Sequence, residues 1–292
     1  MALNRACIGK AYPSVTAEVT RAAIENYARA CNDDNPRYFD QTAGIIAPPL
    51  FAVTVTWIAL IGALTDPVLR ADLLRLLHRA QDMEFFRPIR PGDVINSNAR
   101  IVAIETVAGG ETIALELDAK DDRGEAVSKA VFAAFIRGRR DNDRAMEGKK
   151  AESIEQRGEP WLTVSQKIDR DQTFRYAEAS GDRNPIHVDD KVAKMAGLPG
   201  VIVHGLCTMA FTSKVMIDTL CDGDPLRLRR LAVRFSRPVF PGDQISTRVW
   251  PSSAEEHRVF TYETCTPEGL IVIRDGVAEI SPHHSGRGLA AR

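Results

Sequence analysis

The chain contains one structural unit twice, and this repeat limits the folds it can adopt more than any other feature. Residues 85–95 read FFRPIRPGDVI, and residues 235–245 read FSRPVFPGDQI. Upstream, residues 27–40 (YARACNDDNPRYFD) match residues 176–189 (YAEASGDRNPIHVD). Blocks that recur in the same order indicate a recurring structural unit. We therefore expect the two halves to share one fold.

Length and local composition agree with two such units. A chain of 292 residues is long enough for about two domains, each with its own core. Segment 141–158 is dense in charge and almost free of large apolar residues, which is typical of a linker. The sequence thus predicts an N-terminal domain at 1–140, a charged linker at 141–158 and a C-terminal domain at 159–292.

The two halves predict the same order of elements, which is clearest in the second. Residues 162–168 alternate as in a strand, and Asp169 with Gln172 forms a capping box for a helix that ends near Gly181. A second, apolar helix begins at Gly205. Strand patterns follow at 228–238, 243–250, 258–265 and 270–280. The simplest assembly is an α+β fold in which an antiparallel sheet wraps around one long helix.

The loop after the first of these helices carries the residue types of an acid/base site. Asp182 and His187 lie five residues apart across Asn184 and Pro185, a dipeptide that holds the chain extended. Both side chains can therefore turn toward one cavity. A histidine with an ordinary pKa of about 6.5 can act as a base near neutral pH. The N–H of Gly205 lies at a predicted helix start, where free donors and the positive dipole end favour an oxyanion.

These residues also carry a family resemblance. The D-x-N-P-x-H run at 182–187, with the His-Gly pair at 204–205, resembles the MaoC-type, or R-specific, enoyl-CoA hydratases (hydratase 2) of the hot-dog superfamily. The resemblance is close from about Leu162 to Ile280 and covers the first half as a degenerate copy. It implies a tandem (double) hot-dog fold, with each half an antiparallel sheet around a central helix.

The resemblance also implies a reaction and a set of roles. The reaction is the reversible hydration of a trans-2-enoyl-CoA to an (R)-3-hydroxyacyl-CoA by a water that Asp182 and His187 activate, with Gly205 as the oxyanion donor. Asn184 is expected to fix the loop beside the substrate by side-chain-to-backbone bonds. Ser213, two helical turns after Gly205, matches a serine that family members often carry near the water or the carbonyl.

The first half lacks two of these features. Tyr38 stands where His187 stands in the second half, and the region that corresponds to the His-Gly pair reads Ala47-Pro48-Pro49-Leu50. A proline has no N–H to donate to an oxyanion. We therefore expect only the second half to catalyse the reaction. By the same resemblance, the first half accommodates the acyl tail of the substrate.

Three other activities are compatible with this sequence. The same residues can run the reaction as a dehydratase on a 3-hydroxyacyl thioester of an acyl carrier protein. An acyl-CoA thioesterase on the same fold would instead release free thiol. A non-catalytic acyl-CoA-binding subunit is the alternative from another class, although the presence of Asp182, His187 and Gly205 argues against it.

Composition excludes several classes of partner. The chain has 38 basic and 39 acidic residues, a net charge of -1, so it has no general basic field for nucleic acid. Five scattered cysteines without C-x-x-C spacing argue against a disulfide framework and a zinc site, and they fit a reducing cytoplasm. Segment 42–65 has no charge, but Pro48-Pro49 and two glycines interrupt it, so it predicts a buried helix rather than a membrane span.

The sequence predicts no bound metal and no cofactor. Coenzyme A enters as part of the substrate, and neither a dinucleotide fingerprint nor a P-loop is present. His283 and His284 are adjacent in the C-terminal tail without a carboxylate or cysteine at ligand spacing. A hot-dog unit normally pairs with another across its sheet edge, and tandem copies can pair within one chain, so both a monomer and a homodimer are compatible with the sequence.

Overall fold

A single antiparallel sheet of ten strands forms the frame of the computed structural model, which describes residues 2–138, 158–252 and 258–282. The strand order is β1-β3-β4-β5-β2-β7-β10-β9-β8-β6, so each half contributes five neighbouring strands in the same relative order. The strands are β1 (Val15–Glu18), β2 (Leu76–Phe85), β3 (Val94–Val107), β4 (Gly110–Asp121), β5 (Ala126–Arg137), β6 (Leu162–Lys167), β7 (Leu228–Phe235), β8 (Gln244–Pro251), β9 (Val259–Cys265) and β10 (Ile271–Ile280).

The two five-stranded sheets join where β2 pairs with β7, and we call this pair the seam. Asp82 lies opposite Ala232, and Ala80 lies opposite Arg234. The repeat that relates Phe85 to Phe235 also relates Asp82 to Ala232 by the same offset. Asp82 and its equivalent Ala232 therefore face each other at the centre of the seam, as expected at an approximate two-fold axis. The pairing within one chain that the sequence allowed is confirmed.

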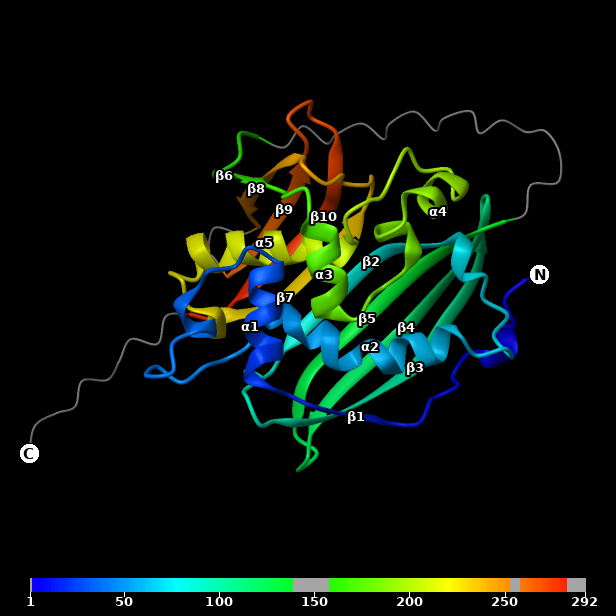
Figure 1. Ribbon diagram of the computed structural model, residues 1–292, viewed down its shortest axis with the longest axis horizontal. Coiled ribbons are helices and arrows are strands. Elements are labelled where there is room, and N and C mark those ends of the chain that lie inside the picture. Colours follow the sequence, from blue (N-terminus) through cyan, green and yellow to red (C-terminus); the bar gives the residue numbers. More distant parts are fainter. Residues whose placement is uncertain (1, 139–157, 253–257, 283–292) are drawn as a thin grey trace, which may run out of the picture.

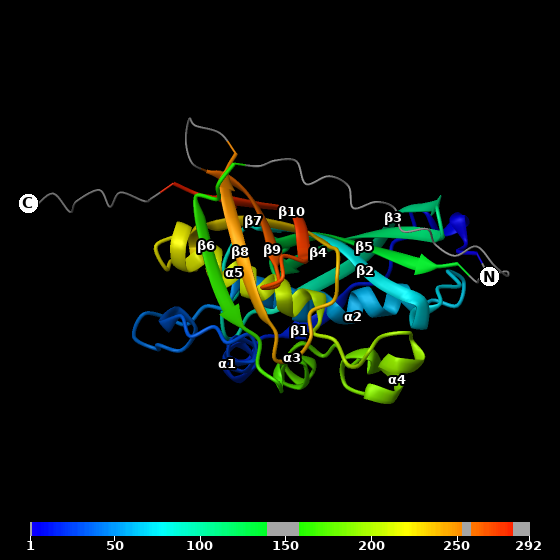
Figure 2. The same ribbon diagram turned by 90° about the horizontal axis from the view of Figure 1, so that it is seen from above.

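The helices lie on one side of this sheet (Figures 1 and 2). Helix α2 packs on β3 and β4 of the first half, and α5 packs on β7 of the second, while α1 and α3 pack on each other. Tyr27 of α1 and its repeat equivalent Tyr176 of α3 are both fully buried, with ring centroids 5.7 Å apart. The helices are α1 (Arg21–Ala30), α2 (Ala52–Leu64), α3 (Gln172–Ser180), α4 (Asp190–Met195) and α5 (Gly205–Leu220). Short 3-10 turns, including Pro49–Phe51 and Pro185–His187, connect them.

The predicted capping box at the start of α3 forms only in part. The Gln172 side chain accepts a hydrogen bond from the Asp169 N–H at 3.2 Å, as predicted. The Asp169 carboxylate instead pairs with Arg175 at 2.7 Å and accepts from Asn32 of the first half at 2.9 Å. The residue before the helix is Asp171. The Asp169 carboxylate therefore binds Arg175 and Asn32 and does not cap the helix as the sequence predicted.

The charge-free segment at 42–65 ends in α2, most of whose side chains are buried, as predicted. Among the described residues, no helix is long and apolar enough to span a membrane. The predicted linker at 141–158 lies almost wholly outside the described residues, and so do His283 and His284. The domain limits therefore stay a prediction.

A glycine in β10 supplies a test of this packing. A Cβ atom on Gly276 would lie 2.6 Å from ring atoms of Tyr262, which is fully buried. We expect Gly276→Ala to lower the free energy of unfolding by about 1–3 kcal/mol because the ring has no space to move into. Urea denaturation followed by circular dichroism measures this change.

Gly62→Ala is the matched control. Gly62 lies in α2, and a Cβ atom there would meet nothing within 4 Å. Alanine is favoured over glycine inside a helix, so this variant should be as stable as the wild type or gain up to about 1 kcal/mol. Equal stability of the two variants would contradict the packing described for Gly276.

Candidate active site

The loop that follows α3 is shaped by its own side chains. Gly181 ends the helix with a φ of 81°, and a Cβ atom there would lie 3.3 Å from the indole of Trp57 in the first half. The Asp182 carboxylate accepts from the Asn184 N–H at 3.1 Å, and the Asn184 side chain accepts from the Ile186 N–H at 3.3 Å. Asn184 thus has the loop-fixing contacts expected of it. These bonds bend the chain so that Asp182 and the 3-10 turn Pro185–His187 face the same space.

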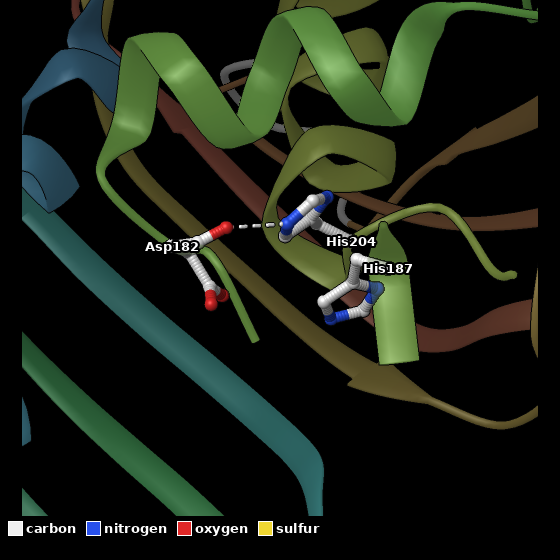
Figure 3. A group of neighbouring side chains, drawn as sticks. All are labelled: Asp182, His187 and His204. Atoms are coloured by element: carbon white, nitrogen blue, oxygen red, sulfur yellow. Dashed lines mark hydrogen bonds between the residues drawn. The ribbon is translucent and has the colours of Figure 1, made fainter. Parts of the chain in front are cut away.

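Three side chains meet in that space. One potential ligand atom from each of Asp182, His187 and His204 lies within 4.8 Å of the other two (Figure 3). The exposed fraction is 8 % for His187 and 1 % for His204, whereas Asp182 is only partly buried. The structure therefore brings together the two predicted acid/base residues and adds the histidine that precedes α5.

Hydrogen bonding fixes the tautomer of His187. Its Nδ1 lies 2.8 Å from the carbonyl oxygen of Ile202, an acceptor, so Nδ1 carries the proton. In the neutral ring, Nε2 then holds a free lone pair. A nitrogen in this state can accept a proton from a water molecule.

His204 has a different task, since both of its nitrogens have partners. Nε2 donates to the backbone carbonyl of Asp182 at 2.9 Å, and Nδ1 lies 3.2 Å from the Thr173 hydroxyl. The His204 ring stacks on His187 with centroids 3.8 Å apart. The single proton of the Thr173 hydroxyl also faces the carbonyl oxygens of His187 at 3.0 Å and Ile202 at 3.2 Å. His204 supports the loop through its bond to Asp182 and packs on His187.

Burial sets the charge of the pair. It raises the pKa of Asp182 above the ordinary 3.8 and lowers the pKa of His187 below the ordinary 6.5, while the attraction between the two charges opposes both shifts. Burial and the nearby His187 together lower the pKa of His204 well below 6.5. Both rings are therefore neutral near pH 7, and His187 is ready to act as a base.

Gly205 begins α5, and the ring of Phe235 fills the space beside it. Atoms of this ring lie 3.1 Å from the position that a Cβ on Gly205 would take, so only glycine fits without a shift. The first N–H groups of a helix have no partner inside it. The Gly205 N–H is such a donor, at the positive end of the helix dipole. Ser213 is buried farther along α5, and its place near the substrate stays a prediction.

The first half keeps the loop but not the base. Asn35 donates its N–H to the Asp33 carboxylate at 3.3 Å, as Asn184 does to Asp182. Tyr38 is fully buried at the place of His187, and among the described residues its hydroxyl has no hydrogen-bond partner. Asp33 lies 3.7 Å from Lys214, and burial raises its pKa to about 6. The equivalent of the active carboxylate therefore faces a lysine instead of an imidazole.

A cavity of about 570 Å³ lies beside this altered loop and contains none of the residues of the second-half site. Its walls are largely apolar and come from both halves, including Pro48 and Phe85 of the first and Leu228 of the second. Pro49, which also lines the cavity, and Phe85 are the repeat equivalents of Gly205 and Phe235. The cavity thus lies at the first-half counterpart of the start of α5.

Two residues of the site carry no signal in the sequence pattern. Thr173 contacts residues 14 and 31 positions away, so no local spacing marks it. Trp57, which packs on Gly181, belongs to the other half of the chain. Both contacts arise only when the two halves are folded together.

Comparison with known proteins agrees with this geometry. Residues 151–268 match the MaoC like domain, and residues 6–130 match the FAS1-like dehydratase domain region. The "Probable enoyl-CoA hydratase 2" of Dictyostelium discoideum is 29% identical over 84% of this chain and 81% of its own length. The peroxisomal enoyl-CoA hydratase 2 of Arabidopsis thaliana is 32% identical over 69% of this chain and 68% of its own length.

The chain belongs to the MaoC-like dehydratase and hydratase 2 family. Members of this family are hydro-lyases, so the chain is an enzyme of that class, and acyl-CoA thioesters are its implied substrates. The chain also aligns with the mouse peroxisomal multifunctional enzyme type 2 at 26% identity, where it spans 38% of the longer protein.

Solved structures confirm the double hot-dog fold of this hydratase 2 family member. A MaoC-like dehydratase from Phytophthora capsici superposes with a TM-score of 0.79 at 24% identity, covering 96% of this chain and 100% of that one. A Mycobacterium tuberculosis protein described as a double hot-dog fold superposes with a TM-score of 0.65 at 11% identity, covering 94% and 95%. At these identities the likeness concerns the fold alone.

The pKa shifts give a test of the acid/base pair. Since burial lowers the pKa of His187, kcat/KM should fall toward acid as His187 becomes protonated, through a transition below the ordinary histidine pKa of 6.5. The Asp182 charge raises the pKa of His187, so in Asp182→Asn an NMR titration of the His187 ring should show a still lower pKa. An acid limb above pH 7, or an unchanged His187 titration in the variant, would contradict this pairing.

Proposed function

We propose that the chain adds water reversibly to trans-2-enoyl-CoA and forms (R)-3-hydroxyacyl-CoA at the Asp182–His187 pair. The observation that carries the proposal is the neutral His187 with a free Nε2, beside a carboxylate in the same space. Family membership supports the reaction class. The hand of the product follows the R-specific family that the motif resembles.

The pair would handle one water molecule at a time. His187 Nε2 removes a proton from the water as its oxygen bonds to Cβ of the enoyl group, and Asp182 orients that water. The pair returns one proton to Cα, so a water is added across the double bond without net gain or loss of a proton. Each proton-transfer group contributes roughly a hundredfold or more to the rate.

Negative charge gathers on the thioester oxygen during this addition. The Gly205 N–H would donate to that oxygen, helped by the positive end of α5. Loss of one such donor typically costs about 3 kcal/mol in the transition state. Asn184 holds the loop in place, and Ser213 is proposed to lie near the water or the carbonyl.

We also propose a division of labour between the halves, with limits at 1–140, 141–158 and 159–292. The first half would receive the acyl tail. Two observations support this assignment. The walls of the 570 Å³ cavity are largely apolar, and the first half has Tyr38 in place of the histidine. The cytoplasm and a monomer or homodimer remain our predictions for compartment and assembly.

One observation favours a second candidate. The first half matches a dehydratase region of fatty acid synthase type, which suggests a substrate carried by an acyl carrier protein. The same residues would then eliminate water from a 3-hydroxyacyl thioester. A comparison of enoyl-CoA with the matching acyl-carrier-protein thioester distinguishes the two carriers.

The test is the decay of enoyl-thioester absorbance with trans-2-enoyl-CoA substrates of several chain lengths. We expect wild type to consume the substrate and form the R-alcohol without free thiol. Asp182→Asn and His187→Ala should each lower kcat by about a hundredfold or more while remaining folded. Release of free thiol would indicate a thioesterase.

Asp33→Asn is the matched control for Asp182→Asn. It makes the same change at the equivalent position of the first half, and kcat should stay within about threefold of wild type because no base faces that carboxylate. If both asparagine variants lost activity equally, or if neither did, the assignment of catalysis to the second half would be wrong.

A further inference from the structure

A histidine of the first half lies against the active site of the second. His78 is on β2, next to the seam, and its ring packs on Phe235 with centroids 4.8 Å apart. Phe235 is the ring that fills the space beside Gly205. His78, Phe235 and Gly205 thus form a continuous line of packing from the first half to the proposed oxyanion donor.

The backbone and two hydrogen bonds hold this imidazole in one orientation. The pairing of β2 with β5 shifts register between His78 and Ala80, and such bulges redirect side chains. His78 Nε2 lies 3.1 Å from the Ala80 carbonyl and 3.1 Å from the side-chain oxygen of Gln81. Both partners are acceptors, so Nε2 carries the proton. On its other side the ring packs on Phe132, with centroids 4.3 Å apart.

The imidazole is neutral under the conditions in which His187 acts. Burial, with a smaller contribution from the nearby His187, lowers the pKa of His78 to about 4. A neutral ring beside the site adds no positive charge that would oppose protonation of His187 during the reaction. It also packs on an aromatic face without the cost of burying a charge.

The repeat supplies an internal comparison for this position. The offset that relates Phe85 to Phe235 relates His78 to Leu228, which is buried at the wall of the first-half cavity. The fold therefore accepts an aliphatic side chain at this place in the sheet. A planar ring fixed by two hydrogen bonds occurs only beside the half that carries Asp182 and His187.

We propose that His78 is a positioning residue of the active site, whose ring holds Phe235 against Gly205 and so fixes where the Gly205 N–H meets the thioester oxygen. This inference rests on the proposed function. It deepens that proposal by assigning one part of the second-half site to the first half. His78 acts through Phe235 and not by contact with the substrate.

Three substitutions separate the ring from its hydrogen bonds. His78→Leu introduces the residue found at 228, His78→Gln keeps an N–H donor but loses the ring, and His78→Phe keeps a ring but loses the donor. We expect the leucine and glutamine variants to lower kcat by about ten- to a hundredfold with KM within about twofold of wild type, because a misplaced donor acts on the transition state. His78→Phe should retain more of kcat than either. Ile101→Val, at a buried position of β3 that belongs neither to the cavity nor to the site, is the control and should leave kcat unchanged.

A second measurement does not depend on turnover. In protein labelled with ¹⁵N-glycine, the Gly205 amide resonance, assigned by its loss in Gly205→Ala, should move in His78→Leu and stay in place in Ile101→Val. If the wild type consumed no enoyl thioester, the proposed function would be wrong. The position of the Gly205 resonance in His78→Leu would still show whether His78 positions the Gly205 N–H.

Three outcomes would overturn the inference about His78. The first is folded His78→Leu with wild-type kcat and an unmoved Gly205 resonance. The second is a rise in KM at constant kcat, which would mean direct binding of substrate. The third is recovery by His78→Gln but not by His78→Phe, which would assign the effect to the N–H instead of the ring.

Discussion

The pairing of β2 with β7 is the contact on which the rest of the molecule depends. It turns two five-stranded sheets into one and relates the halves by an approximate two-fold axis at Asp82 and Ala232. Because of it, Trp57 reaches the loop at Gly181 and the ring of His78 reaches Phe235. The acid/base residues all come from the second half, but their surroundings come from both.

Hydrogen bonding distinguishes the two histidines of the candidate site. His187 and His204 are stacked imidazoles of similar burial, yet their hydrogen bonds differ. His187 gives one nitrogen to a carbonyl and keeps the other free, whereas His204 has partners for both. Whether each histidine can accept a proton from water thus depends on which of its ring nitrogens are hydrogen-bonded.

The repeat, the order of elements along each half, the loop and the start of α5 could be predicted from the sequence because local patterns determine them. Thr20 caps α1 and Asp189 caps α4 through short-range hydrogen bonds of this kind. The sequence did not reveal that Asp169 binds Arg175 and Asn32 in place of the helix end, since Asn32 is 137 residues away. It also gave no sign of Thr173, Trp57 or His78, whose neighbours are set by packing between the halves.

The covalent link between the halves has a consequence for how such a site can diverge. In a dimer of two identical chains, any residue placed at one side of the central strand pair must also appear at the other. Here the two equivalent positions are encoded separately in one chain, so residue 78 can be histidine while residue 228 is leucine. The pairing is also intramolecular, with an effective concentration that dilution does not change. One chain can therefore carry a complete, one-sided site without depending on the abundance of a partner.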